Sequence, residues 1–583
     1  MKTPPEATEP VAQPASPQPL TALQQALREE AGPAVVIGTA SPARAKNRDV
    51  DRLAGNRWTR WIFPSMTDLL FVASMAWMFM SSGKHGWQSL LADGDVGWHI
   101  RVGQYILSHG KVPQQDLFSF SKPGAPWFAW EWLADVIDAG LHNAAGLKGI
   151  VLIAGAIIAW FGITLLRRAV VAGAHPFIAL LVMLLGTGAA SIHYLARPHI
   201  YTLLLLSLCM GMLEADRRRQ NQKTPARYLW WLIPVTLLWT NLHGGFLVLV
   251  LVLGLATLGN IIETVWEQAD LAGGLDLAGL HLASADWSRS CQYGLLTLGC
   301  AAVSLVNPYG WGLHKHVIEY LRSDWIRNII QEFQSPSFRS ESMMQFEVLL
   351  FVGLISLGAL VRRRRIVESL WILAFAYLAL SGARHVPVFV AAVSPLIALE
   401  MSWWWRQLAG AASRKSILGI LNQVAADIEP GFRRSSLLPL MFVAGLAVLG
   451  SPTPWPTDFP PEVFPVEMVH AHEAQILQAR LLTTDQWADY LIYLHPEQKV
   501  FVDGRSDFYG PEVGNQFLHV INGAPDWSKV MDKFQFNLAL LPVDVPLAQL
   551  LKQQPVWRVV ADNGKQILLA RNAPSLVLTK AKN

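Results

Sequence analysis

The sequence predicts a polytopic α-helical membrane protein that ends in a small soluble α/β domain. Of its 583 residues, 52% are hydrophobic and only 15% are charged, whereas charged residues make up about a quarter of an ordinary soluble domain. Many apolar runs approach the ~20 residues that cross the hydrocarbon core of a bilayer. These runs stop near Gly450, where a Pro-rich stretch and then a mixed strand and helix pattern follow.

Hydropathy places about eleven transmembrane helices in a membrane domain that spans residues 58–450. The predicted spans are Phe63–Ser81, Gly149–Leu166, Pro176–Tyr194, His199–Ala215, Tyr228–Leu238, Phe246–Ile262, Tyr293–Val306, Phe346–Val361, Ser369–Leu380, Val386–Met401 and Leu437–Leu449. Several of them are shorter than the ~20 residues of a full span.

The distribution of Lys and Arg predicts the orientation of these spans. Alternating the spans places every basic segment on one face, and such segments stay in the cytoplasm. The long loop 82–148, the loop 307–345 and everything after Gly450 then lie outside. We therefore expect a multi-pass protein of a bacterial inner (plasma) membrane, with a cytoplasmic N-terminus and an extracytoplasmic C-terminal domain. The basic segments are residues 44–60, 167–168, 217–227, 362–365 and 406–434.

The two ends of the chain differ from the membrane domain in composition. Residues 1–57 are rich in Pro, Ala and Gln, which predicts a disordered cytoplasmic tail. Residues 451–465 predict a stiff Pro-rich linker, and residues 466–583 predict the soluble α/β domain. Its expected elements are strands at Leu481–Thr483, Lys499–Asp503 and Leu538–Leu541, helices at Asp485–Leu494 and Val545–Lys552, and a hairpin of Trp557–Ala561 and Gln566–Ala570 around Asn563-Gly564.

A polar cluster follows the first predicted span directly. It contains Asp93, Asp95 and His99, in the order Asp-Gly-Asp-Val-Gly-Trp-His. Ionisable groups at a membrane boundary are costly and usually mark function. Two amphipathic stretches of the same outer loop, Ile100–Ser108 and Trp130–His142, are expected to lie flat at the interface. The second stretch carries Glu131 and Trp132.

Four further polar clusters fall at the outer ends of predicted spans. Each cluster by itself is typical of residues at the end of a helix, but together with the aspartates the clusters predict one outward-facing cavity. The guanidinium groups of Arg197 and Arg384 suit a lipid-linked phosphate. The two aspartates suit either activation of a hydroxyl acceptor or binding of a divalent metal. The clusters are Arg197-Pro198-His199, Asn241-Leu242-His243-Gly244-Gly245, Asn307-Pro308-Tyr309-Gly310 and Arg384-His385.

The order of these motifs resembles that of GT-C-type integral membrane glycosyltransferases, in particular bacterial members. The motifs are Asp-x-Asp-x-x-Trp-His, Gly-x-x-Pro-x-x-Asp-x-x-Ser, Trp-Glu-Trp-Leu, Arg-Pro-His, Asn-Leu-His-Gly-Gly-Phe and Asn-Pro-Tyr-Gly. Val502-Asp503-Gly504-Arg505 with Tyr509 is similar to the soluble tail of those members. The resemblance covers most of the chain from about Phe63.

This resemblance implies a GT-C-like fold and a reaction. A sugar would move from a polyprenyl-phosphate donor to an acceptor glycan, lipid or protein on the extracytoplasmic face. The resemblance assigns proton removal or metal binding to a carboxylate of the first outer loop, which here is Asp95 or Asp93. We expect Asp95 to be the base, Asp93 to cap the following helix, and His99 to orient Asp95 or share a metal.

Several alternatives stay open at this point. Asp95 could simply be the N-cap of the interfacial helix, and Asp503 and Arg505 are expected to pair structurally. The protein could also be a non-catalytic membrane assembly protein or a transporter of a lipid-linked substrate. Membrane lipid is an expected partner and nucleic acid is not, and a divalent metal is the candidate cofactor. The predicted substrate-binding residues are Glu131, Trp132, Arg197, His199, Asn241, His243, Arg384 and His385.

Overall fold

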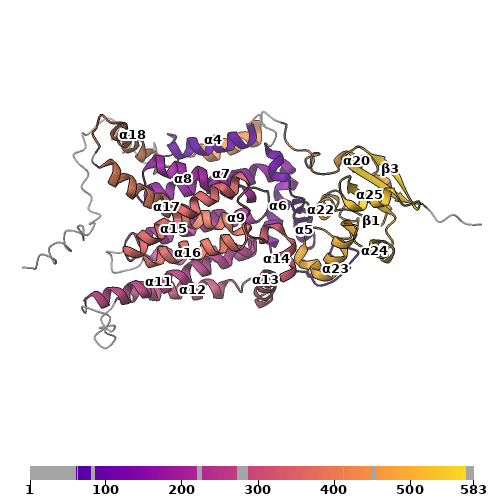
Figure 1. Ribbon diagram of the computed structural model, residues 1–583, viewed down its shortest axis with the longest axis horizontal. Coiled ribbons are helices and arrows are strands. Elements are labelled where there is room, and N and C mark those ends of the chain that lie inside the picture. Colours follow the sequence, from indigo (N-terminus) through magenta and orange to yellow (C-terminus); the bar gives the residue numbers. More distant parts are fainter. Residues whose placement is uncertain are drawn as a thin grey trace, which may run out of the picture. The chain divides into compact units, whose positions relative to one another are not determined.

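The computed structural model describes residues 61, 63–80, 86–219, 226–271, 286–410, 412–449 and 454–572. These residues form a bundle of long helices and a C-terminal region, residues 454–572, that combines helices with a small sheet (Figure 1). The predicted N-terminal tail, residues 1–57, lies outside the described residues, as do the first residues of the predicted linker.

Each of the eleven predicted spans coincides with a helix of the bundle. Within the described residues, six helical segments are long and apolar enough to cross a membrane, and three shorter apolar helices, α4, α16 and α19, accompany them. The number of spans therefore stays a prediction. The helices are α4 (Met66–Met80), α7 (Leu147–Val171), α8 (Pro176–Ala190), α9 (His199–Arg217), α10 (Leu232–Leu242), α11 (Leu247–Leu271), α12 (Ser288–Val303), α15 (Glu341–Arg362), α16 (Ile366–Ser381), α17 (Val386–Ala409) and α19 (Leu438–Leu449).

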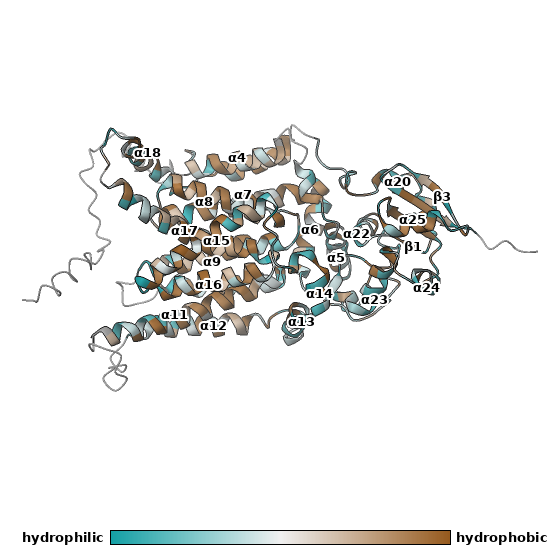
Figure 2. Cartoon of the chain, in the orientation of Figure 1, coloured by the Kyte–Doolittle hydropathy of each residue, from teal (hydrophilic) through white to brown (hydrophobic). Residues whose placement is uncertain are grey.

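The outside of the bundle is apolar. Large side chains such as Trp77, Leu298 and Val448 are exposed there, and Figure 2 shows hydrophobic residues along most of the helices. A soluble protein rarely exposes such extensive apolar surface. The inside is also apolar, with Trp239 and Trp371 fully buried. Helices that are apolar on all sides belong in a bilayer, so the chain is a multi-pass membrane protein.

The alternating direction of the helices separates two polar ends of the bundle. Basic residues such as Arg168, Arg217 and Arg362 lie at or near the C-terminal ends of α7, α9 and α15. The polar clusters of the predicted cavity lie at the opposite end, where α9, α11 and α17 begin. We call these two ends the basic end and the site end. Helix α18 (Ile417–Phe432) follows α17 at the basic end, at the far left of Figure 1.

Two amphipathic helices, α5 (Asp95–His109) and α6 (Trp132–Ala145), pack against each other at the site end. The sequence predicted α5 from Ile100, and the helix in fact begins five residues earlier. Their crossing depends on Gly103, because a Cβ there would lie 1.8 Å from the carbonyl oxygen of Asp135. The close approach of α5 and α6 places residues of one helix in hydrogen-bonding reach of the other.

Shorter helices complete the site end and the connections between long helices. They are the 3₁₀ helices η1 (Trp87–Leu91), η2 (Ser191–His193), η3 (Arg227–Trp231), η4 (Gly244–Phe246), η6 (Gln331–Phe333) and η7 (Ala383–His385), and the α-helices α13 (Trp311–Arg322) and α14 (Asp324–Ile329).

The C-terminal region contains a four-stranded sheet in the order β1-β2-β4-β3. The pair β1 (Leu481–Leu482) and β2 (Leu538–Pro542) is parallel, whereas β4 (Gln566–Arg571) is antiparallel to β2 and to β3 (Trp557–Asp562). The predicted strands at these places and the hairpin around Gly564, which has φ of 82°, are confirmed. The helices are α20 (Val466–Ala471), α21 (Glu473–Leu477), α22 (Asp485–Leu494), α23 (Ser506–Ile521), α24 (Trp527–Lys533) and α25 (Pro546–Lys552).

The predicted strand Lys499–Asp503 is wrong, because this segment joins no strand of the sheet. Its backbone pairs instead with the first loop. The amide of Val500 donates to the carbonyl of Phe118 at 2.9 Å, and the amide of Phe120 donates to the carbonyl of Val500 at 2.9 Å. Buried backbone N–H and C=O groups need hydrogen-bond partners even where an apolar run joins no sheet. The partners of Val500, Phe118 and Phe120, are almost four hundred residues away in the chain.

Helix α22 extends the contact between the C-terminal region and the first loop. The amide of Gly94 donates to the Gln486 side chain at 2.7 Å, and the Arg101 guanidinium donates to the carbonyl of Tyr493 at 2.6 Å. Buried residues of α5 and α22 belong to one hydrophobic core. The residues that follow Val500 are therefore held beside the start of α5.

Candidate active site

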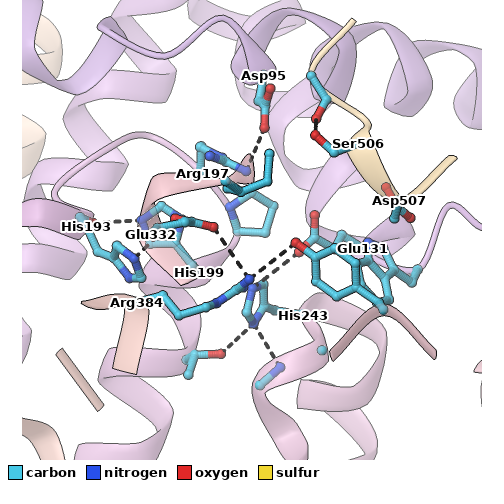
Figure 3. A pocket seen from close by; sticks show the side chains of 18 of the residues that line it. Asp95, Glu131, His193, Arg197, His199, His243, Glu332, Arg384, Ser506 and Asp507 are labelled. Atoms are coloured by element: carbon cyan, nitrogen blue, oxygen red, sulfur yellow. Dashed lines mark hydrogen bonds and ion pairs between the residues drawn. The ribbon is translucent and has the colours of Figure 1, made fainter. Parts of the chain in front are cut away.

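A cavity of about 500 Å³ lies at the site end of the bundle (Figure 3). Eight residues predicted from the sequence line it: Asp93, Asp95, Glu131, Arg197, His199, His243, Arg384 and His385. The C-terminal region contributes lining residues that the sequence did not predict: Asp485, Gln486, Ser506 and Asp507. Further unpredicted lining residues of the bundle are His193, Tyr320 and Glu332. The cavity thus joins side chains from most of the length of the chain.

The start of α5 distinguishes the roles of the two aspartates. The N-cap of the helix is Gly94, and the Asp93 Oδ1 atom accepts a hydrogen bond from the Asp95 amide at 3.0 Å. Asp93 therefore accepts from the first helical amide, but the prediction that Asp93 caps this helix is wrong, because the N-cap is Gly94. The alternative in which Asp95 is the N-cap is wrong, since Asp95 is already the first helical residue.

Arg197 joins both aspartates. Its Nη1 lies 2.8 Å from Asp93 Oδ2, and its Nη2 lies 2.6 Å from Asp95 Oδ2. Burial raises the pKa of Asp95, and the guanidinium of Arg197 opposes that shift. Burial alone would lower the pKa of Arg197, but the two carboxylates hold it well above its usual value. The Asp95 Oδ1 and Arg197 Nε atoms are buried and have no hydrogen-bond partner among the described residues.

Glu131 lies on the other side of the cavity and faces two histidines. Figure 3 shows it next to His243, whose Nε2 lies 3.4 Å from Glu131 Oε1. The Nε2 of His99 lies 3.6 Å from Glu131 Oε2. Burial raises the pKa of Glu131 to about 8, and Arg197 opposes this shift. A carboxylate with a pKa near neutrality is suited to take and return a proton.

His99 lies behind Glu131 rather than in the cavity lining. Its Nδ1 lies 2.6 Å from Asp135 Oδ1, and both side chains are fully buried. Burial lowers the pKa of His99 well below its usual value and raises that of Asp135 well above its own. Asp135 is not among the residues predicted from the sequence, although its position four residues after Glu131 in an amphipathic stretch places both on one face.

A second cationic group lies across the cavity. The Arg384 Nη1 donates to the Tyr320 hydroxyl at 3.2 Å and lies 3.5 Å from Glu332 Oε1. Glu332 also lies 3.7 Å from His193 Nε2. Burial favours the neutral form of Glu332, but the nearby His193 and the charge of Arg384 hold its pKa well below the usual value. No local sequence pattern connects Glu332 to the other polar clusters.

Trp132 and Asn241 are not among the residues that line the cavity. The Trp132 indole N–H donates to Asn241 Oδ1 at 2.8 Å, and the Asn241 amide donates to the carbonyls of Leu237 and Val306. These bonds link α6 to α10 and satisfy the polar atoms of both side chains. We assign them no contact with a substrate.

The Asn307-Pro308-Tyr309-Gly310 motif also has a structural role. The Tyr309 hydroxyl donates to the carbonyl of Pro113 at 3.1 Å and accepts from the Ala129 amide at 2.7 Å. It therefore ties the loop between α5 and α6 to the start of α13 and fixes the position of Glu131 two residues later.

The expected pair of Asp503 and Arg505 is confirmed at 2.6 Å, and both side chains are buried. Arg505 also reaches Asp116 of the first loop at 2.8 Å. This link fixes the following residues, Ser506 and Asp507, at the cavity wall.

The residues of the site do not fit the divalent metal expected from the sequence. Among the described residues, no three His, Cys, Asp or Glu side chains are grouped so that they could hold a metal ion. Arg197 already takes one oxygen from each aspartate. We derive no step through a metal.

Comparisons with known proteins give structural likenesses only. No family model and no curated protein matches the chain. It is similar to the apo oligosaccharyltransferase of Archaeoglobus fulgidus, at 12% identity and a TM-score of 0.47 over 88% of this chain and 75% of that one. It is also similar to ArnT from Cupriavidus metallidurans bound to undecaprenyl phosphate, at 15% identity and a TM-score of 0.42 over 87% of this chain and 98% of that one.

The apo state of the same ArnT gives 14% identity and a TM-score of 0.43, over 86% of this chain and 97% of that one. Because the TM-scores lie below 0.5, we take no step of the mechanism from these likenesses.

Proposed function

We propose that the protein is a membrane glycosyltransferase that moves a sugar from a polyprenyl-phosphate donor to a hydroxyl acceptor. The observation that carries this proposal is the cavity itself, where guanidinium groups and carboxylates converge at one end of an apolar bundle. A long prenyl chain needs apolar surroundings, a phosphate needs cations, and an acceptor hydroxyl needs a base. The site end offers cations and carboxylates directly beside the apolar helices of the bundle.

Arg384 is the group best placed to hold the donor phosphate. Arg197 shares its two terminal nitrogens with Asp93 and Asp95, whereas Arg384 has a single carboxylate partner at 3.5 Å. A guanidinium forms two parallel hydrogen bonds to phosphate oxygens. Its charge would also stabilise the phosphate as negative charge develops on it during transfer. The histidines and carboxylates around it suit the hydroxyls of a sugar ring.

The reaction has a simple atom balance. The acceptor oxygen forms a bond to the anomeric carbon of the sugar while the bond from that carbon to the phosphate oxygen breaks. The electron pair of the broken bond leaves with the polyprenyl phosphate, and the acceptor proton passes to a carboxylate of the cavity. Asp93, Asp95 and Glu131 are first-loop carboxylates that line the cavity. Asp95, as the sequence indicates, and Glu131 are the two candidates for this proton.

We further propose that the site end and the C-terminal region lie on the extracytoplasmic face. The basic clusters gather at the opposite end of the bundle, and such clusters stay in the cytoplasm. The molecule that accepts the sugar would then be a glycan, lipid or protein of the outer compartment.

A transfer assay with purified protein in lipid vesicles tests the function. A labelled polyprenyl-phosphate sugar is supplied with a mixture of acceptors, and release of polyprenyl phosphate is measured. We expect Arg384→Gln to lose roughly 100-fold or more in transfer, as when one charge-stabilising donor is removed from an active site. The control is Arg327→Gln on α14, an exposed arginine that pairs with its neighbour Asp324. Equal activity of both variants would contradict the phosphate role of Arg384.

A further inference from the structure

We propose that Glu131 is the proton acceptor of the transfer reaction, and that Asp135 is a positioning residue that acts on it through His99. This inference rests on the proposed transfer and names the residues that handle its proton. It assigns a different base from Asp95.

The two candidate carboxylates differ in their ion pairs. Burial raises the pKa of both, to about 7 for Asp95 and about 8 for Glu131, but Asp95 is held by a guanidinium at 2.6 Å that competes with an approaching hydroxyl. Within the described residues, the groups within 4 Å of Glu131 that can carry a positive charge are two histidines, at 3.4 and 3.6 Å. Glu131 also keeps part of its side chain open to the cavity. An acceptor hydroxyl can reach it without breaking an ion pair.

The first histidine presents a proton to Glu131. The Gly245 amide donates to His243 Nδ1 at 2.9 Å, so this nitrogen carries no proton. The ring proton of neutral His243 is therefore on Nε2, the atom that faces Glu131 Oε1. A backbone amide thus fixes the tautomer of His243 from behind.

The second histidine is held in the same way, by Asp135. Asp135 is fully buried, and its Oδ2 has no partner among the described residues. An ionised carboxylate in this setting would be very costly, so Asp135 is a neutral acid that donates to His99 Nδ1 at 2.6 Å. The upward pKa shift caused by its burial agrees with this form. The proton of neutral His99 is then on Nε2, which faces Glu131 Oε2 and has no other partner.

Glu131 therefore lies between two imidazole N–H groups, one directed at each oxygen. Neither contact, at 3.4 and 3.6 Å, is a hydrogen bond in the structure, and a short movement of each ring would close both gaps to hydrogen bonds that orient the carboxylate. When Glu131 takes the acceptor proton, the acceptor oxygen bonds to the anomeric carbon and the phosphate leaves with its electron pair. The charged and titratable groups that face Glu131 are His99, His243, Arg197, Arg384, Asp95 and Asp507.

Three variants of α6 separate this role from a structural one. Asp135→Asn keeps a donor for His99 Nδ1, because the amide N–H replaces the acid O–H, so we expect transfer close to wild type. Asp135→Leu removes the donor at similar size, and we expect kcat to fall roughly 100-fold. Asp138→Leu is the matched control, because Asp138 is buried one turn further along α6, and we expect little loss. If Asp135→Leu behaves like Asp138→Leu, Asp135 has no positioning role. If Asp135→Asn falls as far as Asp135→Leu, Asp135 is not a neutral donor.

The base assignment has its own comparison. Glu131→Gln keeps the size and removes the base, so we expect it to lose more transfer than Asp95→Asn. A greater loss in Asp95→Asn would overturn Glu131 as the proton acceptor.

Magnetic resonance of isotope-labelled histidine tests the mechanism without an assay of activity. The His99 signals are assigned by their loss in His99→Gln. We expect Nδ1 to be unprotonated and Nε2 protonated in wild type and Asp135→Asn, and a mixture of tautomers in Asp135→Leu. A proton on Nδ1 of wild-type His99 would overturn the donor role of Asp135. If wild type transfers no sugar, the proposed function fails, and the tautomer measurement still decides the contact between Asp135 and His99.

Discussion

The basic end and the site end of the bundle both bury charged side chains, but they treat them differently. At the basic end, Arg217 pairs with Glu263 at 2.8 Å and Glu368 at 2.9 Å, and Arg168 pairs with Glu214 at 2.6 Å. Within the described residues, every polar side-chain atom of these five residues that is fully buried has a partner. These arginines join neighbouring helices and leave nothing for a ligand.

At the site end, buried polar atoms remain without partners around a cavity. Among the described residues they include Asp95 Oδ1, His99 Nε2, Asp135 Oδ2 and Arg197 Nε. An unpaired buried polar atom costs more free energy than a satisfied one. The two arginine networks of the basic end therefore serve stability, whereas these four atoms lie at or next to the cavity. An unpartnered atom alone does not mark a site, since Arg289 Nε and both ring nitrogens of His175 at the basic end are also without hydrogen-bond partners among the described residues. Each experiment that follows changes one side of this comparison.

The largest effect is expected on the stability of the basic end. Arg217→Met removes the arginine partner of Glu263 and one of the two arginine partners of Glu368, which keeps Arg365, and breaking such a buried pair costs about 3–5 kcal/mol. Thermal unfolding in detergent measures the loss. Transfer per folded molecule should stay at the wild-type level. A stable Arg217→Met protein would remove the structural role of this end, and a selective loss of transfer would make the two ends functionally alike.

The second effect is the pH dependence of transfer. Burial raises the pKa of Glu131 to about 8, so its ionised form, the base, appears as the pH rises. The value of kcat/KM should therefore increase with pH and level off above pH 8, with a gain of roughly 50-fold between pH 6 and pH 8 for a single titrating base. Glu131→Gln should lose this rise along with its activity. A wild-type profile that is flat across this range would contradict a base with a raised pKa.

A smaller effect is expected for Asp95→Asn. The amide still accepts a hydrogen bond from Arg197, but the loss of charge weakens the ion pair, so we expect about a tenfold loss of transfer and little change in unfolding temperature. Kinetics with purified protein at several donor concentrations measure it. Complete loss with normal stability would return the base role to Asp95, as the resemblance implies.

The smallest effect on the protein is expected in a labelling experiment, which measures its orientation in the membrane and not its activity. Single cysteines are placed at exposed positions, Lys529 in the C-terminal region and Arg363 at the basic end. An impermeant reagent added to whole cells should label the first position and not the second, because basic loops stay in the cytoplasm. The opposite labelling pattern would place the cavity in the cytoplasm and reverse the proposed orientation.

Much of the fold could be predicted from the sequence, because hydropathy and turn chemistry are local. The eleven apolar segments are helices, and Gly564 marks the hairpin of the C-terminal sheet. Most of the cavity residues could also be predicted, since alternating spans bring Asp93, Arg197 and Arg384 to the same end.

Partners that are distant in the chain could not be predicted. The apolar run at Val500 suggested a strand of the sheet, and only the structure gives its pairing with Phe118. Trp132 and Asn241 looked like ligands because nothing local shows that they bind each other. The four-residue spacing of Asp135 from Glu131 could have indicated that both lie on one helix face. The burial of Asp135 against His99 could not, because it depends on the close crossing of two helices at Gly103.

The pairing of Val500 with the first loop also has a consequence for biosynthesis. A ribosome completes all the helices of the bundle before it makes residues 504–507, which form part of the cavity wall. The chain therefore has an incomplete cavity until its last part has been synthesised and has folded against α5. A truncated chain would insert into the membrane with an open, unfinished site, so the order of synthesis itself delays any chemistry until the whole protein has been made.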